Sequence, residues 1–276
     1  MKTVDFFGTN TGRLVMGGNP INGWSYITEK ISRDEMMDYY TAENAIAALR
    51  RAEALGYTAF ISTTDDFTRR YYRQYKNEGG SLKWIAQTHV PLRIEACVNN
   101  AIENGAIAIF HQGTHGDGLF ENGQLDVLKE NLKEMRRAGI PVGIASHVPE
   151  HIAIAEQERL DIDFYMASLH NMRRNSAGRV SSSISGLKSE AHQFFREDRE
   201  EMLKTIRSLD KPCIAYKILG GGHYAFNRED LKQCFVETYS GIKPGDIATV
   251  GVFQRDRDQI KENALLLDEV LGELKI

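Results

Sequence analysis

Four histidines follow apolar runs of the sequence, at the points where each run gives way to polar residues. The clearest case is the stretch 107–117, IAIFHQGTHGD, in which an apolar run typical of a strand buried on both faces stops at His111. His89, His147 and His170 end three other runs in the same way. In a parallel α/β protein the carboxyl ends of the strands form the active site, so we expect these imidazoles there.

Neutral imidazoles at one end of a barrel are suitable ligands for a divalent metal such as Zn, Mn, Fe or Ni. We expect His111 and His147 to be ligands, with His170 as a third ligand and a carboxylate completing the shell. The alternative is that these histidines are ordinary polar residues that hydrogen-bond to backbone at the strand ends. The available carboxylates are Asp65, Asp66, Glu95 and Asp117.

Lys217 and Asp65 are the candidates for moving protons. Lys217 follows the run 214–216 at the predicted rim, where a partly desolvated lysine serves as a general base, a Schiff-base nucleophile or an anion clamp. A salt bridge is its alternative role. Asp65 either takes part in catalysis or caps the following helix. We expect Asp65, His111 and Lys217 to be catalytic, with Lys217 and Asp65 as base and acid.

The elements that must position these residues alternate between strand and helix. Strands are predicted from short apolar runs and helices from apolar residues at helical spacing. The predicted strands cover residues 14–16, 58–62, 82–86, 107–110, 141–145, 164–168, 213–216 and 247–252. The predicted helices cover residues 41–55, 69–75, 94–104, 125–138, 151–159, 197–209, 228–239 and 259–274. Eight evenly spaced units favour an α/β fold of the (β/α)8 TIM-barrel type over an open doubly wound sheet.

Three further segments have distinct patterns. Residues 6–15, FFGTNTGRLV, predict a short hairpin before the first barrel strand. Three glycines within 113–118 predict that the chain leaves regular structure after His111. A long loop is predicted over 171–191. Nothing in the composition divides the chain, so we expect residues 1–276 to form a single domain.

Composition narrows the class of protein. A net charge of −4 and a pI near 6.1 give no support for nucleic-acid binding. Three cysteines without CxxC spacing predict neither a zinc–cysteine site nor a disulfide framework, and favour a reducing compartment. No apolar run has the length of a membrane span, and the first residues lack the apolar core of a signal peptide. We expect a cytoplasmic protein with a small-molecule substrate, and the oligomeric state stays open.

Six short motifs occur in order along nearly the whole chain. They are FFGTNTGRLVMGGNP at 6–20, GY at 56–57, the strand ending in His111, GIASH at 143–147, YKILGGG at 216–222, and Gln259 with Glu262-Asn263. In this order they resemble landmarks of the aldo-keto reductase superfamily. Those landmarks are an opening hairpin and first strand, a Gly-hydrophobic pair, an active-site histidine, Gly-Val-Ser-Asn, Tyr-Ser-Pro-Leu-Gly-x-Gly and a Glu-Asn pair.

The resemblance implies an NADP cofactor and the residues that would hold it. Ser146 would lie at the nicotinamide carboxamide, and the pair near the C-terminus at the adenosine. The implied cofactor-binding residues are Ser146, Tyr216, Gly220, Gly221, Glu262 and Asn263.

The resemblance also implies that most of the reductase machinery has been lost. The family reduces carbonyl groups with a tyrosine, assisted by aspartate, lysine and histidine. Alignment on Gly56 places Ile61 at the aspartate position and Asp66 near the tyrosine position. The third strand ends in 88–89, Thr-His, without the lysine, so only His111 remains of the four.

These patterns predict a barrel enzyme that performs acid–base chemistry, with or without a metal. The expected reactions are isomerisation, epimerisation, elimination or hydrolysis of a small hydroxylated or carbohydrate-like substrate. Arg173, Arg174 and Arg179 of the long loop either grip a carboxylate, phosphate or sugar from a lid or form an ordinary solvated basic loop. One alternative is a divergent NADP-dependent oxidoreductase. Another is a non-catalytic barrel that binds a small ligand.

Overall fold

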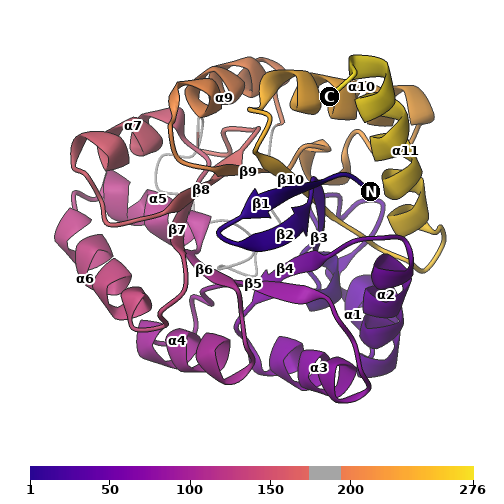
Figure 1. Cartoon of the computed structure of the whole chain (residues 1–276), viewed down its shortest axis with the longest axis horizontal. Helices are drawn as coiled ribbons and strands as arrows, with labels where there is room; N and C mark the ends of the chain where they lie inside the picture. Colours follow the sequence, from indigo (N-terminus) through magenta and orange to yellow (C-terminus); the bar gives the residue numbers. More distant parts are fainter. Residues whose placement is uncertain (174–193) are drawn as a thin grey trace.

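A closed barrel of eight parallel strands organises the chain. The computed structural model describes residues 1–173 and 194–276 (Figure 1). The strands follow one another around the barrel in chain order, with β10 closing against β3. They are β3 (Leu14–Gly17), β4 (Ala59–Thr63), β5 (Lys83–Gln87), β6 (Ala108–His111), β7 (Val142–Ser146), β8 (Phe164–Ser168), β9 (Cys213–Tyr216) and β10 (Ile247–Gly251). The predicted (β/α)8 barrel is confirmed, and the open sheet is wrong.

Helices surround the barrel on its outer side (Figure 1). The eight predicted helices form, with ends that differ from the prediction by a few residues. The helices of the described residues are η1 (Pro20–Asn22), α1 (Arg33–Tyr39), α2 (Ala42–Ala54), α3 (Asp66–Asn77), α4 (Ile94–Glu103), α5 (Gly113–Glu121), α6 (Leu125–Arg136), α7 (Pro149–Gln157), α9 (Glu197–Ser208), η2 (Gly220–Gly222), α10 (Arg228–Gly241) and α11 (Gln259–Leu274).

Strand residues alternate between the barrel interior and the helix layer because successive side chains point to opposite faces. The interior forms a small apolar cluster of its own, separate from the larger cluster between strands and helices. Both faces are therefore apolar, as expected for parallel strands covered on both sides. The buried interior residues are Phe6, Val15, Ala59, Ile61, Ile85, Ala108, Phe110, Ala145, Phe164, Met166, Ile214 and Ile247.

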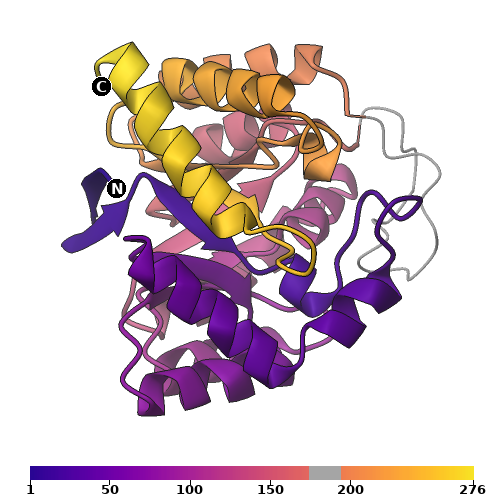
Figure 2. The ribbon, with the colours of Figure 1, turned by 90° about the vertical axis from the view of Figure 1, so that its right-hand side faces the viewer.

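The N-terminal hairpin covers one end of the barrel. Strands β1 (Thr3–Phe6) and β2 (Thr9–Gly12) pair antiparallel, and they lie at the opposite end from η1 and α1 (Figure 2). The predicted hairpin is confirmed, although it starts earlier than 6–15 because its turn falls at Phe7-Gly8, both with positive φ. Phe6 is 2% exposed and its ring lies edge-on to Phe164, with centroids 5.3 Å apart.

The prediction of irregular chain after His111 is wrong. The glycine-rich stretch forms helix α5, and the Gln112 side chain caps it by accepting a hydrogen bond from the His115 N–H at 2.7 Å. Gly113 allows close packing against the barrel end, because a Cβ there would lie 3.0 Å from Tyr216 Oη. Close packing thus outweighs the low helix propensity of glycine here.

Two other expectations concern segments rather than single elements. Of the predicted loop 171–191, residues 174–191 lie outside the described part of the chain, and so do Arg174 and Arg179. Among the helices that the structure describes, none combines the length and apolar character needed to span a bilayer.

The buried ring of Phe6 leads to a stability prediction. Phe6→Ala should lower the free energy of unfolding by about 3–5 kcal/mol, because it empties an aromatic site against Phe164. Phe7→Ala is the matched control, since Phe7 is 43% exposed and its loss should cost below about 1 kcal/mol. Urea denaturation at neutral pH measures both, and equal losses would contradict a closing role for the hairpin.

Candidate active site

A pocket opens at the carboxyl ends of the strands, facing away from the hairpin. Its volume is about 170 Å³, and it is floored by interior residues such as Phe110 and Met166. His147 and Lys217 line it from the ends of β7 and β9. The other lining residues are Asn19, Trp24, Tyr26, Thr63, Gln87, Thr88, His89, Val90, Pro91, Gln112, Gly113, Thr114, Ala145 and Tyr216.

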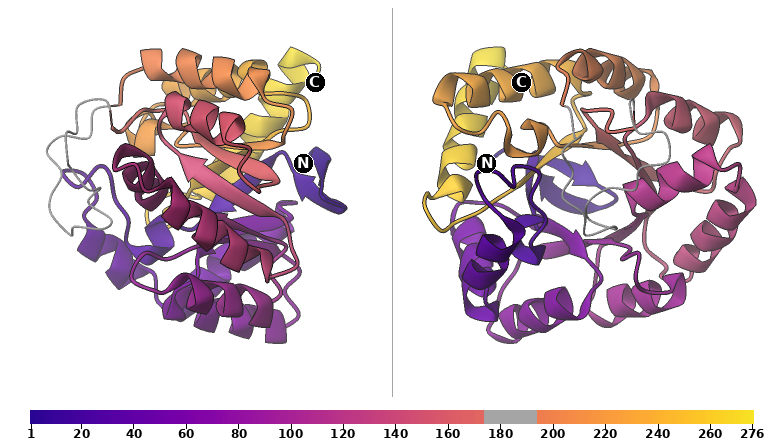
Figure 3. Two further views of the ribbon diagram at one scale, coloured as in Figure 1. Left: turned by 90° about the vertical axis from the view of Figure 1, so that its left-hand side faces the viewer. Right: turned by 180° about the vertical axis from the view of Figure 1, so that it is seen from behind.

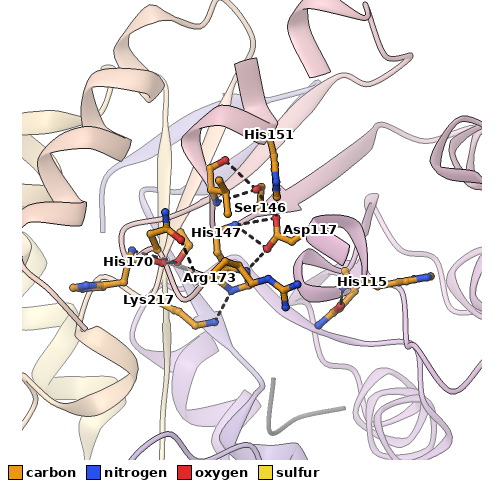
Figure 4. Close-up of polar contacts among 12 residues, drawn as sticks. His115, Asp117, Ser146, His147, His151, His170, Arg173 and Lys217 are labelled. Atoms are coloured by element: carbon orange, nitrogen blue, oxygen red, sulfur yellow. Dashed lines mark hydrogen bonds and ion pairs between the residues drawn. The ribbon is translucent and has the colours of Figure 1, made fainter. Parts of the chain in front are cut away.

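Asp117 of α5 is the buried carboxylate behind this pocket (Figure 4). Its side chain is 0% exposed. Ser146 Oγ donates to Oδ1 at 2.6 Å, His151 Nδ1 lies 3.0 Å from Oδ1, and His147 Nδ1 lies 2.7 Å from Oδ2. Burial raises the pKa of Asp117, but the hydrogen bonds from the two histidines and Ser146 lower it more. The pKa therefore lies well below its usual range, and the group is a carboxylate.

His147 is held by Asp117 in one orientation. Its backbone N–H donates to Oδ2 at 3.2 Å while its Nδ1 donates to the same oxygen, so the proton of the neutral ring resides on Nδ1. Burial, together with the Lys217 ammonium, lowers the pKa of His147 against the opposing effect of Asp117. His147 is thus a neutral imidazole whose Nε2 lone pair faces Lys217.

Lys217 donates to that lone pair, with Nζ 3.1 Å from His147 Nε2 (Figure 4). The ammonium also lies over two aromatic rings, 4.6 Å from the centroid of Tyr26 and 4.9 Å from that of Tyr216. Lys217 has a φ of 56°, a left-handed conformation that costs a non-glycine residue about 1–2 kcal/mol. Such strain gathers at functional sites.

Two contacts fix the backbone around Lys217. The Gly220 N–H donates to the Lys217 carbonyl at 2.8 Å, and buried Arg199 donates from Nη1 to the Ile218 carbonyl at 2.6 Å. The lysine is therefore held in a strained conformation by contacts on its carboxyl side.

The hydrogen-bonded series Asp117–His147–Lys217 can transfer protons. Each link is within hydrogen-bond reach, and the carboxylate orients the imidazole and would stabilise it in its protonated form. The sequence predicted Lys217 and His147 at this end of the barrel, but not their contact.

His111 is not part of the pocket. Phe110 faces the barrel interior, so His111, the next residue, faces the helix layer, where it is 0% exposed and its Nε2 lies 3.2 Å from Asn131 Nδ2 on α6. Burial, with the neighbouring His115, lowers its pKa to about 3. The expected catalytic and metal-binding roles of His111 are not supported by this position.

The expected metal ligands do not converge. His147 bonds to Asp117 and Lys217, whereas His170 Nδ1 bonds to the Phe195 carbonyl at 3.0 Å and the ring packs beside Tyr224. With His111 outside the barrel, the three imidazoles share no centre. No group of three or more His, Cys, Asp or Glu side chains suited to a metal exists among the described residues. The donor set therefore does not fit a divalent metal.

Asp65 has the contacts of a helix cap. Its Oδ1 accepts from the Thr68 N–H at 2.8 Å at the start of α3, and its Oδ2 accepts from Asn22 Nδ2 at 2.8 Å. It is not among the residues that line the pocket, although Thr63 is. The alternative interpretation of Asp65 as a cap is confirmed by these contacts, and they do not support its expected role as the catalytic acid.

The residues expected to hold NADP are engaged elsewhere. The Ser146 hydroxyl donates to Asp117, and Tyr216 Oη donates to the Ser146 carbonyl at 3.2 Å. A Cβ on Gly220 would meet Tyr224 at 2.6 Å, and one on Gly221 would meet Tyr26 and Phe194 at 2.9 Å, so aromatic rings of this chain fill the space beside both glycines.

The remaining two residues of the cofactor set lie on α11. Glu262 pairs with Arg257 at 2.5 Å, and Asn263 is 3% exposed. Together with the filled glycine loop, these contacts give no support for a dinucleotide site among the described residues.

The sequence analysis did not identify two residues of this hydrogen-bonded cluster. Asp117 was considered only as one of four available carboxylates, and His151 only as the start of a predicted helix, yet His151 is 8% exposed and bonds to Asp117. A signal for His151 existed: Pro149 starts α7, which places His151 in its first turn beside the end of β7. Arg173 pairs with Glu121 and contributes positive charge near Asp117.

The depressed pKa of Asp117 predicts a pH-dependent loss of stability. Its contribution is present above the ordinary aspartate pKa and is lost as the pH falls towards its folded-state pKa. Asp117→Asn should lower the free energy of unfolding by roughly 2–4 kcal/mol at pH 7 and by less at pH 3. Denaturation at both pH values measures this. Asp161→Asn, at a 74% exposed side chain, is the control with little effect, and a pH-independent loss would contradict the charged form.

The low pKa of His111 predicts a second pH effect. Between pH 6.5 and about 3 the unfolded chain binds a proton at this residue that the folded chain does not. Stability is therefore complete above pH 6.5 and falls as the pH decreases, by up to about 1.4 kcal/mol per unit. His111→Gln should flatten this slope between pH 6 and 4 in urea denaturation. Parallel curves for the variant and the original chain would contradict the buried position.

No protein-family model matches the sequence, and no curated protein sequence matches it. Solved structures match over almost the whole chain. An aldo-keto reductase from Bacillus halodurans in its holo form aligns with a TM-score of 0.57 at 11% identity, covering 99% of this chain and 94% of that one. A glycerol dehydrogenase from Gluconobacter oxydans aligns with a TM-score of 0.52 at 11% identity, covering 99% and 95%.

An enzyme of another kind has the same barrel. A dihydropteroate synthase from Yersinia pestis aligns with a TM-score of 0.52 at 11% identity, covering 100% of this chain and 99% of that one. At these identities the likeness shows the fold alone. The chain thus has the barrel fold seen in aldo-keto reductases, and its structural neighbours are enzymes of several classes.

Proposed function

We propose that this chain is an acid–base enzyme that isomerises, epimerises or eliminates from a small hydroxylated carbonyl compound. The observation that supports this is the chain of contacts Asp117–His147–Lys217, which runs from a buried carboxylate to an ammonium on the pocket wall. A neutral imidazole oriented by a carboxylate is suited to take up a proton and return it.

Each of the three residues has its own role. His147 is the general base and acid, because its Nε2 carries a lone pair at neutral pH. Lys217 places a positive charge where it can stabilise an oxyanion on a carbonyl or leaving oxygen. Asp117 touches neither pocket nor substrate, and it positions His147 and stabilises its protonated form.

The pocket lining favours a substrate with hydroxyl groups. Thr63, Gln87, Thr88 and Gln112 bring hydroxyl and amide groups to the wall, and they come from β4, β5 and β6 or the residues just after them. Trp24, Tyr26 and Tyr216 add aromatic faces on which the C–H groups of a sugar pack. A three- or four-carbon sugar matches both the lining and the small volume.

Two alternatives predicted from the sequence have less support. The metal-assisted form has no converging ligand set within residues 1–173 and 194–276. The NADP-dependent oxidoreductase needs an open glycine loop, whereas Tyr26, Phe194 and Tyr224 lie against Gly220 and Gly221. A barrel that binds a ligand without turnover does not require a base oriented by a buried carboxylate.

The proposal predicts exchange of carbon-bound hydrogen. In D2O the protein should exchange the α-hydrogens of dihydroxyacetone, D-glyceraldehyde or D-erythrose, followed by proton NMR. His147→Gln should slow this exchange about 10²–10⁴-fold, because the base is lost. Lys217→Gly should slow it similarly and remain folded, since glycine accepts the φ of 56° without strain.

The controls separate chemistry from folding. Lys129→Met removes a lysine that pairs with Glu158 on the surface, and exchange should not change. NADPH titration runs in parallel. Exchange that is absent from the original chain, or equal in all variants, would contradict the proposal, and tight NADPH binding would favour the oxidoreductase.

A further inference from the structure

We propose that Lys217 binds its carbonyl substrate covalently, as an iminium ion. The inference rests on the proposed acid–base function and deepens it, because it assigns the substrate class: an aldehyde or ketone with an adjacent carbon-bound hydrogen. An iminium makes that hydrogen far more acidic than the parent carbonyl does.

The geometry around Lys217 is that of an activated nucleophile. Such sites place the nucleophile within hydrogen-bond reach of a base, and a third group orients the base. Here Nζ is 3.1 Å from His147 Nε2, and His147 Nδ1 is 2.7 Å from the Asp117 carboxylate. Lys217, His147 and Asp117 are thus arranged as nucleophile, base and orienting group.

The partner of Lys217 differs from that of lysines held in ion pairs. Lys211 lies 2.7 Å from Glu156, and Lys232 pairs with Glu269 at 2.8 Å, so a carboxylate holds each ammonium. Within residues 1–173 and 194–276, no ion pair with a carboxylate is formed by Lys217, and its polar contact is the lone pair of a neutral imidazole. A base in place of a counter-ion can accept the proton that must leave the amine.

The covalent step balances without an oxidant or a co-reactant. The Lys217 ammonium passes one proton to His147 Nε2, and the free amine forms an N–C bond to the carbonyl carbon. The carbonyl oxygen takes one amine hydrogen to give the carbinolamine. Protonated His147 then returns its proton to that hydroxyl, the C–O bond breaks and water leaves. The product is the iminium ion, with one hydrogen on nitrogen. His147 is again neutral and can remove the α-hydrogen.

The aromatic faces suit this chemistry because the positive charge stays in place. Before the step Nζ carries the charge over Tyr26 and Tyr216, and afterwards the iminium nitrogen carries it at the same position. Tyr216 Oη is anchored on the Ser146 carbonyl, so its ring keeps its position. The left-handed φ of Lys217 sets the direction in which its side chain leaves the backbone towards the pocket.

Reductive trapping tests the inference directly. The full chain is incubated with D-glyceraldehyde and sodium cyanoborohydride, and peptide mass spectrometry follows the labelling rate of each lysine. Lys217 should be labelled at least ten-fold faster than Lys129, with saturation in the probe. His147→Gln should slow labelling of Lys217 at least ten-fold and leave Lys129 unchanged. Lys217→Arg keeps the charge and should show no adduct at residue 217.

Deuterium exchange in parallel samples without cyanoborohydride distinguishes failure of this inference from failure of the proposed function. Exchange without preferential labelling of Lys217 would overturn the iminium and leave acid–base catalysis in place. Labelling without exchange would support the iminium and contradict proton transfer. Loss of both would overturn both.

Discussion

A carboxylate with no access to water stays charged only where hydrogen-bond donors surround it, and Asp117 is such a group. Its donors come from the end of β7 and the first turn of α7, while Asp117 itself lies on α5. One buried charge thus connects α5, the end of β7 and α7 at the pocket end of the barrel. The orientation of His147 follows from this arrangement, and so does the environment of Lys217.

The opposite end of the barrel performs a different task. The hairpin lies at this end (Figure 3), and Phe6 closes it. Interior side chains fill the space between hairpin and pocket. This division agrees with the general rule that the amino end of a (β/α)8 barrel provides stability and the carboxyl end provides chemistry. The strained backbone of Lys217 lies at the carboxyl end, and the packed core and Arg199 support it.

The alternation of apolar runs and amphipathic helices was sufficient to predict the barrel, because both patterns arise from burial. It was not sufficient to predict which way a side chain points. Strand β6 is apolar on both faces, so its sequence does not tell which of its residues face the barrel interior. His111 was therefore predicted to lie in the pocket, although Phe110 is the residue that faces the interior. The glycines of α5 were interpreted as a loop, since the close packing of Gly113 against Tyr216 depends on a partner 103 residues later in the chain. For the same reason the contact of Asp117 with His147 could not be predicted.

The tautomer of His147 is the most direct test of this arrangement, and nitrogen NMR of ¹⁵N-histidine-labelled protein measures it, with His147→Gln assigning the signal. At neutral pH we expect a neutral ring protonated on Nδ1, with a hydrogen-bonded lone pair on Nε2. Asp117→Asn should remove the preference for that form. A ring protonated on Nε2, or an imidazolium at neutral pH, would contradict the contact with Lys217 and the catalytic roles that depend on it.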